Sequence, residues 1–376
     1  MAMSARGRLT ALLVFAVLLA GLAAAAGGGA DDPLISLDYL TNIFAPAAER
    51  AAQEKLDEAG KRVYDDAEAR WRTGVAAAET AASAERVRSW TEARLKHGDV
   101  LSTLTGSQVM LLSGSVSAQY SAGAVVDVTD GAVLPSGGEL KAQHRYLVAE
   151  DTAALFTVVS RTAVLDYCGD YHFSYSTATP DYNAMASALK TLHLFRGSNA
   201  GYGGGFDLET APTRIQALIM LIRLLGEEDA AMERVGVSPF ADIPAGYWGA
   251  PYVAYAVEKG YTNGVGGNRF APDLPASSSM YVEFILRALG YSSTAQTDVS
   301  TAVRRALDAG VITDGEQAVL NTVEFLRADV VYLSWYALDV PVAQNMEALH
   351  RKLEGMGVFT AAEYRTARST VSSARL

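Results

Sequence analysis

A pattern that recurs along residues 178–340 constrains the fold of this chain more than any other feature. Three short segments align with one another: 212–216, 276–280 and 325–329. Twelve residues after the middle position of each segment stand Gly226, Gly290 and Asp339. Self-similarity of this kind is the mark of a repeat architecture, in which one supersecondary unit is used several times.

Each unit of the repeat predicts a helix, a glycine-rich loop and a second helix. The second helix of the first unit has an apolar face, formed by Ile215, Leu218, Ile219, Ile222 and Leu225. A glycine directly after the last apolar residue, as at Gly226 and Gly290, signals the end of a helix. The shorter helices that precede the loops are expected at 185–194, 252–259 and 303–309.

The three units, about 178–230, 240–291 and 298–340, share motifs to different degrees. The second unit carries the fullest set, namely Phe240-Ala241-Asp242, Trp248, Tyr252-Val253, Gly260–Gly264 and Phe270–Asp273. The first unit has Thr213-Arg214, and the third keeps Leu326–Asp329 but no obvious Phe-x-Pro loop. With these motifs residues 178–340 resemble the S-layer homology (SLH) family, whose Thr-Arg-Ala-Glu signature falls at Thr213-Arg214.

The resemblance implies a pseudo-threefold bundle of three helical repeats with grooves between them. It also implies non-covalent attachment of an exported protein to a secondary cell-wall polysaccharide, often pyruvylated, that is linked to peptidoglycan. The residues expected to bind the polymer are Arg214, Arg327, Thr213, Gly197, Gly264 and Trp248.

Elementary chemistry agrees with an arginine at a helix start as the anion-binding group. A guanidinium there can hold a carboxylate bidentately, and free backbone N–H groups and the helix dipole add to the attraction. Gly197 and Gly264 let the backbone approach a ligand closely, and Trp248 could stack on a sugar. The alternatives are arginines bonded to neighbouring carboxylates, glycines used only in turns, and a core tryptophan.

The units are not expected to bind equally well. In the second unit Ser278 stands where the signature arginine belongs, and Gln216 and Met280 replace the signature acid in the first two units. The loop of the third unit is irregular. We therefore expect one or two working grooves rather than three.

The rest of the chain differs in character from the repeats. Residues 1–26 carry early arginines, an apolar run and small residues, as a signal peptide does, and a retained membrane anchor is the alternative. Residues 27–97 are rich in Ala, Glu, Lys and Arg and predict a helical segment. Short β-type runs punctuated by glycines predict a small antiparallel β-domain over 98–177, and a helical tail is expected at 341–376.

Composition excludes several classes of function. The formal charge of −11 argues against nucleic acid as the main partner, and 50% hydrophobic residues suffice for real cores. The single Cys168 cannot form an internal disulfide or a cysteine-based zinc site. No cofactor, metal site or catalytic group is expected, although Cys168 near His172 leaves a Cys–His nucleophile as a remote alternative.

Together these features predict a secreted α+β multidomain protein of the cell wall or cell surface that is not an enzyme. Its expected partner is the wall polysaccharide. One alternative is a self-assembling S-layer-like subunit, in which the chain forms a homo-oligomer. The other is an envelope enzyme that uses the β-domain or Cys168.

Overall fold

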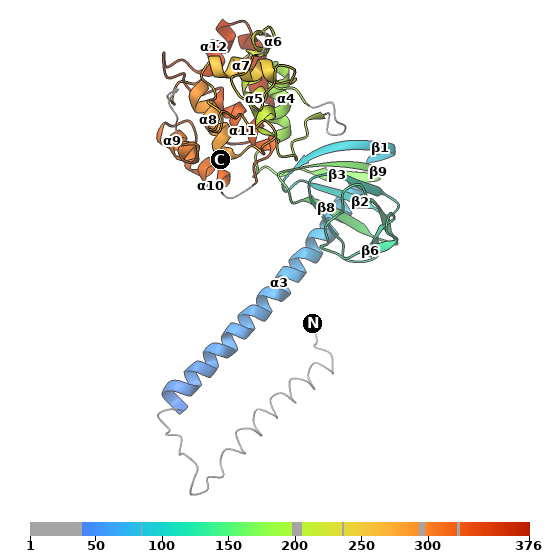
Figure 1. The fold of residues 1–376 in the computed structure, drawn as a ribbon. Helices are drawn as coiled ribbons and strands as arrows, with labels where there is room; N and C mark the ends of the chain where they lie inside the picture. Colours follow the sequence, from blue (N-terminus) through green and yellow to red (C-terminus); the bar gives the residue numbers. More distant parts are fainter. Residues whose placement is uncertain (1–39, 84, 198–204, 235–236, 293–297, 322–323) are drawn as a thin grey trace, which may run out of the picture. The chain divides into compact units, whose positions relative to one another are not determined.

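A computed structural model of the chain describes residues 40–83, 85–197, 205–234, 237–292, 298–321 and 324–376 (Figure 1). The predicted signal peptide at 1–26 lies outside these residues. The chain divides into two compact units, Met1–Ala69 and Arg70–Leu376. None of the described helices combines the length and the apolar character needed to cross a bilayer.

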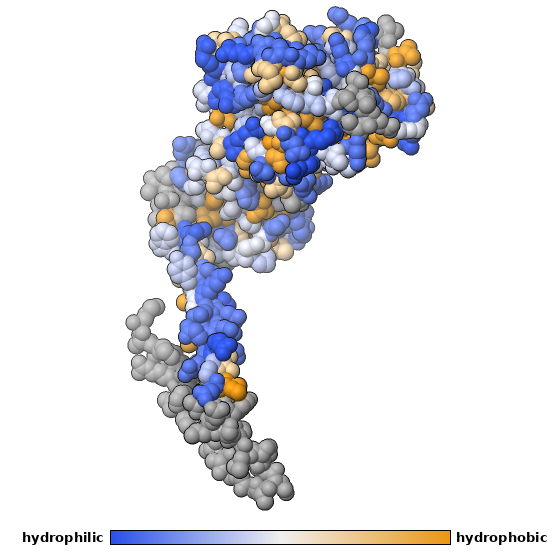
Figure 2. All heavy atoms as spheres, turned by 90° about the vertical axis from the view of Figure 1, so that its left-hand side faces the viewer, coloured by the Kyte–Doolittle hydropathy of each residue, from blue (hydrophilic) through white to orange (hydrophobic). Residues whose placement is uncertain are grey.

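The predicted helical segment contains one long helix, α3 (Ala45–Ser83), which follows a π-helical turn, η1 (Leu40–Phe44). Strong helix formers fill it, and its 39 residues make it about 58 Å long. Its large apolar side chains are exposed, among them Leu56, Val63 and Trp71 at 65%, 70% and 68%. Hydrophilic residues cover most of the helix (Figure 2).

The predicted β-domain is a nine-stranded antiparallel sheet. Its strands are β1 (Glu85–Lys96), β2 (Val100–Leu104), β3 (Gln108–Ser113), β4 (Val116–Gln119), β5 (Ala124–Asp127), β6 (Ala132–Leu134), β7 (Arg145–Ala149), β8 (Ala153–Val158) and β9 (Thr162–Ser174). The order is β4-β8-β2-β9-β3-β7-β5-β6, and β1 also pairs with β9. The long strand β9 therefore organises the domain, and its first half supplies core side chains such as Leu165 and Tyr167.

One expectation about this region is wrong. Residues 85–96 form strand β1, although we expected the helical segment to continue to residue 97. The physical reason is an alternation in which Val87, Ala93 and Leu95 fall on one face and pack into the β-core. The residues between them are mostly polar or charged, so this strand has a composition similar to that of the preceding helix, and its alternation with a period of two is hard to recognise. The β-domain accordingly begins at residue 85 instead of 98.

The carboxyl-terminal region is built from short helices: α4 (Tyr182–Thr191), α5 (Arg214–Leu224), α6 (Glu228–Met232), α7 (Ala250–Glu258), α8 (Ser278–Ala288), η3 (Val299–Thr301), α9 (Ala302–Asp308), α10 (Asp314–Leu320), α11 (Arg327–Ala337), α12 (Leu349–Gly355) and α13 (Ala361–Thr370). The helices expected before and after each loop are all present. Gly226 and Gly290 follow the ends of α5 and α8 with φ of 67° and 82°, as the cap prediction requires. A capping box formed by Thr360 and Glu363 starts α13, within the predicted helical tail.

Three helices form the centre of this region. α5, α8 and α11 contact one another, and their side chains belong to one continuous apolar core. Every residue of α11 is buried, including Trp335 at 1% exposure. The remaining helices surround these three (Figure 1). The amino-terminal ends of the three central helices are therefore held in fixed positions.

Candidate functional site

The first turns of α5, α8 and α11 each bond to a segment from another of the three predicted units. The bonds run from Arg214 N to Leu274 O (2.8 Å), from Ser278 Oγ to Leu320 O (3.0 Å) and from Arg327 N to Thr210 O (2.9 Å). The first unit thus contacts the second, the second contacts the third, and the third contacts the first. The three contacts form a closed ring. The starts of α5 and α11 each lie against a loop of a neighbouring unit, and the start of α8 lies against the end of α10.

The side chain of Arg214 is deeply buried in the first of these contacts, with 4% exposure. Its Nη2 donates to Thr262 Oγ1 at 3.1 Å and, at the weaker distance of 3.4 Å, to Gly264 O. Its guanidinium carbon lies 5.0 Å and 5.2 Å from the ring centroids of Phe270 and Phe284. Arg214 Nε is buried and has no hydrogen-bond partner among the described residues.

This guanidinium is a buried cation for which the described part of the chain provides no acidic partner. Within the described ranges no ion pair joins Arg214 to a carboxylate, and the charged group that acts on it is another cation, Arg287. Burial, assisted by Arg287, lowers the pKa of Arg214 to about 10. The side chain still carries its charge at neutral pH. Buried charges in proteins are normally paired, so the site is electrostatically incomplete.

Arg327 occupies the matching place on α11 and is 8% exposed. Its Nε donates to Phe206 O at 3.1 Å, and its guanidinium carbon lies 5.8 Å from the ring centroid of Phe195. The pKa of Arg327 lies below its ordinary value because the side chain is buried, and the nearby Asp207 opposes this shift. Arg327 is therefore better satisfied within the protein than Arg214.

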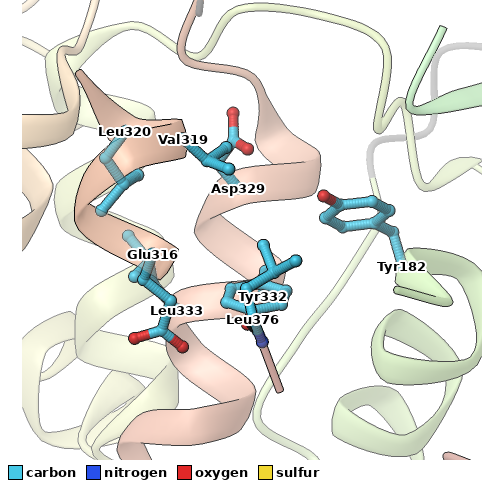
Figure 3. A pocket seen from close by; sticks show the side chains of 8 residues that line it. All are labelled: Tyr182, Glu316, Val319, Leu320, Asp329, Tyr332, Leu333 and Leu376. Atoms are coloured by element: carbon cyan, nitrogen blue, oxygen red, sulfur yellow. Dashed lines mark hydrogen bonds between the residues drawn. The ribbon is translucent and has the colours of Figure 1, made fainter. Parts of the chain in front are cut away.

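Asp329 stands in the place of the signature acid and has a structural role. Its Oδ2 accepts from Leu326 N at 2.7 Å, which caps α11, and lies 2.9 Å from Arg161 Nη1. Burial raises the pKa of Asp329 to about 6, and Arg161 opposes the rise. The cavity beside it, formed by α10, α11 and Tyr182, measures about 10 Å³ (Figure 3). That volume holds about one water molecule, so it is no site for a sugar.

The two predicted glycines lie where backbone segments of the protein meet. A Cβ on Gly264 would lie 2.4 Å from Arg269 O, and Gly264 has a φ of 77°. A Cβ on Gly197 would lie 1.9 Å from Gly205 O. Both glycines are therefore required by loop packing, and the Gly264 carbonyl also contacts Arg214. Thr213 begins α5, where its N–H donates to Gln216 Oε1 at 2.9 Å.

Trp248 is 61% exposed, which contradicts the alternative of a core tryptophan. Its ring lies 5.5 Å from that of Tyr247. The next residue, Gly249, approaches α5 so closely that an added Cβ would lie 3.0 Å from Ile215 Cγ1. The structure thus places Trp248 near the amino-terminal end of the helix that carries Arg214.

Sequence reasoning missed the groups that surround the guanidinium: Thr262, Phe270 and Phe284. Phe270 belongs to the motif Phe270–Asp273, which would have pointed to it if the neighbouring unit had been treated as part of the Arg214 site. Thr262 lies in the motif Gly260–Gly264 in the same way. Phe284 belongs to no motif, and only the packing of one unit on the next brings it to Arg214.

Comparison with known proteins is consistent with this arrangement. The family model described as "S-layer homology domain" matches residues 239–277. The chain contains an SLH domain. The match includes Trp248, Gly264 and Phe270, whereas Arg214 and Arg327 lie outside it.

A "Cell surface protein" of Thermoanaerobacter kivui is 28% identical to this chain over 197 residues. The similar region covers 51% of this chain and 25% of that protein. The chain therefore spans about a quarter of the length of this relative.

Outside the SLH domain, the β-domain holds the groups considered for other chemistry. Cys168 Sγ lies 3.7 Å from Val87 O, as a weak donor would. His172 is four residues further along β9, which corresponds to about 13 Å in a strand, too far for a Cys–His pair. This geometry argues against the alternative of a Cys168 nucleophile.

Three possible metal ligands also lie together in the β-domain. Atoms of Asp127, Asp130 and His144 fall within 4.8 Å of one another. Asp127 already bonds His144 Nδ1 at 2.9 Å and two backbone N–H groups, and Asp130 is paired with the Lys141 ammonium. A cation there would have to displace Lys141, so the cluster is explained by its internal bonds.

Proposed function

We propose that this chain is a cell-envelope protein that is held at the cell surface by its SLH region through a secondary cell-wall polymer. The observation that carries the proposal is the buried guanidinium of Arg214, which finds no acidic partner, and for Nε no hydrogen bond, among the residues that the structure describes. An anionic sugar substituent supplies both missing elements. The SLH match and the cell-surface relative support the same setting.

The ligand chemistry follows from the shape of the guanidinium. A carboxylate, such as that of a pyruvylated sugar, accepts two parallel N–H bonds from an arginine. It would replace the bonds of Nη2 to Thr262 and Gly264 and would satisfy Nε. The rings of Phe270 and Phe284 keep water away and so strengthen the attraction. Trp248 provides an exposed face for a neighbouring sugar ring.

The three helix starts would then contribute unequally to binding. Arg214 is the principal anion site, because Arg327 already bonds Phe206 O and is near Asp207. At the third start, Ser278 bonds Leu320 O and carries no charge. The ring of contacts among the three starts supports our reading of 178–340 as three SLH repeats in a pseudo-threefold bundle.

A sedimentation assay with purified cell walls tests the proposal. The full chain carrying Arg214→Lys keeps the positive charge but loses the bidentate fork, and we expect its wall binding to fall at least tenfold. Arg304→Lys is the matched control, because Arg304 is an arginine of the same region with 69% side-chain exposure. Removal of pyruvyl groups from the walls should weaken the parent chain equally. Undiminished sedimentation of Arg214→Lys would refute the site.

One observation favours the self-assembling subunit as a second function. Helix α3 exposes large apolar side chains at steps of seven to eight residues: Leu56, Val63, Tyr64 and Trp71. Such spacing is that of a helix which pairs with other helices. Light scattering of the full chain at increasing concentration tests this function, since a strict monomer would exclude association through α3.

A further inference from the structure

A group of aromatic rings extends from the middle of strand β9 to just beyond its end. The rings belong to Tyr167, Tyr171, Phe173 and Tyr175. Neighbouring centroids are 4.7 Å apart for Tyr167 and Tyr171, 5.6 Å for Tyr171 and Phe173, and 5.8 Å for Phe173 and Tyr175. Exposure rises along the group, from 6% at Tyr167 to 65% at Tyr175.

The rings border an open cleft of about 360 Å³, to which Glu85 and His172 contribute polar groups. The Tyr171 hydroxyl donates to Glu85 Oε2 at 2.6 Å, which fixes one side of the cleft. A second cleft, of about 390 Å³, is lined by residues of β1 and α4 together with Asp99, Tyr175 and Asp181. Tyr175 lines both clefts, so the two clefts are neighbours.

The second cleft is polar but nearly neutral. Lys96 Nζ is paired with Asp99 Oδ1 at 2.6 Å, and Asp181 accepts the Ala184 N–H at 2.9 Å. The amide of Asn183 and the hydroxyl of Ser187 add uncharged hydrogen-bonding groups. The cleft therefore offers hydrogen bonds without a strong excess of either charge.

We propose that these two clefts, joined at Tyr175, form a binding site for a neutral oligosaccharide. Sugar rings combine an apolar C–H face with a rim of hydroxyls, which matches an exposed aromatic ring beside uncharged polar groups. The site is separate from the anion site at Arg214 and goes beyond the proposed anchoring function. It gives the β-domain a ligand of its own.

Other ligand classes fit these clefts less well. An extended peptide that adds to a sheet needs a free strand edge, but β9 pairs with β1, β2 and β3. A polyanion needs unpaired cations, whereas Lys96 is matched by Asp99. The other cation of the second cleft, Arg94, has its Nε 3.7 Å from Glu92 Oε1. The Phe173 and Tyr175 rings lie within 15° of parallel, and Lys96 Nζ is 5.7 Å from the Tyr175 centroid. Tyr175 is thus held in place although most of its surface is open.

Titration calorimetry of the full chain with chitohexaose tests the proposal. We expect saturable binding, weakened about tenfold in Tyr175→Ala, since a stacked ring contributes on the order of one factor of ten. Tyr64→Ala on α3 is the matched control, because Tyr64 is the same residue type with 68% exposure. Its affinity should equal that of the parent chain.

Two further measurements make the result decisive. Arg214→Lys should bind chitohexaose normally, so failure of wall anchoring and failure of this site are distinguishable. Absence of saturable binding up to millimolar chitohexaose would overturn the proposal, as would equal affinities of Tyr175→Ala and Tyr64→Ala. Tighter binding of polygalacturonate than of chitohexaose would also overturn it, because the site would then prefer an anionic saccharide to a neutral one.

Discussion

Replacement of Arg214 by methionine separates stability from binding in this protein. Arg214 is 4% exposed, and burial lowers its pKa to about 10, more than two pH units below the ordinary value for arginine. One pKa unit corresponds to about 1.4 kcal/mol, so keeping this charge buried costs about 3 kcal/mol. Methionine removes that cost and retains an apolar stem between Phe270 and Phe284.

The lost contacts offset this gain or exceed it. They are two cation–π contacts of about 0.5–2 kcal/mol each and the bonds to Thr262 and Gly264 of about 1 kcal/mol each. We therefore expect the free energy of unfolding of Arg214→Met to lie between the parent value and about 3 kcal/mol below it, while wall binding is lost. Urea unfolding followed by tryptophan fluorescence measures the first quantity, and Trp335 reports from the helical core.

Arg287→Met is the control for this experiment. Arg287 is equally buried, but its Nε lies 2.6 Å from Glu283 Oε1, with side-chain exposures of 5% and 4%. Removing one partner of a buried ion pair costs about 3–5 kcal/mol, and the second contact of Glu283 with Arg305 moderates the loss. If Arg214→Met were destabilised as strongly as Arg287→Met, the guanidinium would be an ordinary structural group and the binding argument would fail.

Three other outcomes are expected. Burial raises the pKa of Asp329 to about 6, so folding favours its protonated form. The free energy of unfolding should therefore fall as the pH rises from about 4 through 6. In Asp329→Asn the urea midpoint should change less with pH over this range. Gly264→Ala should cost about 2–3 kcal/mol, whereas Gly266→Ala, with φ of 92° but open space, should cost about 1 kcal/mol by the same measurement. Trp248→Ala should leave the unfolding free energy within about 0.5 kcal/mol and weaken wall sedimentation.

The sequence predicted the elements whose pattern is local. Runs such as 109–112 and 155–159 have the period and composition of strands, and they correspond to β3 and β8. The ends of α5 and α8 were predicted because Gly226 and Gly290 adopt the left-handed conformation that follows a helix. Strand β1 was missed because its charged residues repeat the composition of α3 while alternating with a period of two.

Tertiary packing decided what the sequence could not. Arg214 was chosen for its place at a helix start, but its burial between Phe270 and Phe284 depends on how one unit packs against the next. The exposure of Trp248 is likewise a property of the folded protein that its sequence motif did not indicate. Local spacing indicates which residue types gather near a helix start, and only the fold decides whether their polar atoms are satisfied.

The closed ring of contacts at the three helix starts joins the units independently of the side chains that would bind a ligand. The bond from Arg327 N to Thr210 O uses only main-chain atoms, so it persists whatever side chains the third unit carries. That unit can lose its loop motif and still join its neighbours, whereas deleting it would leave the first and second units without their common partner. A unit that bound no ligand would therefore still serve to hold its two neighbours together.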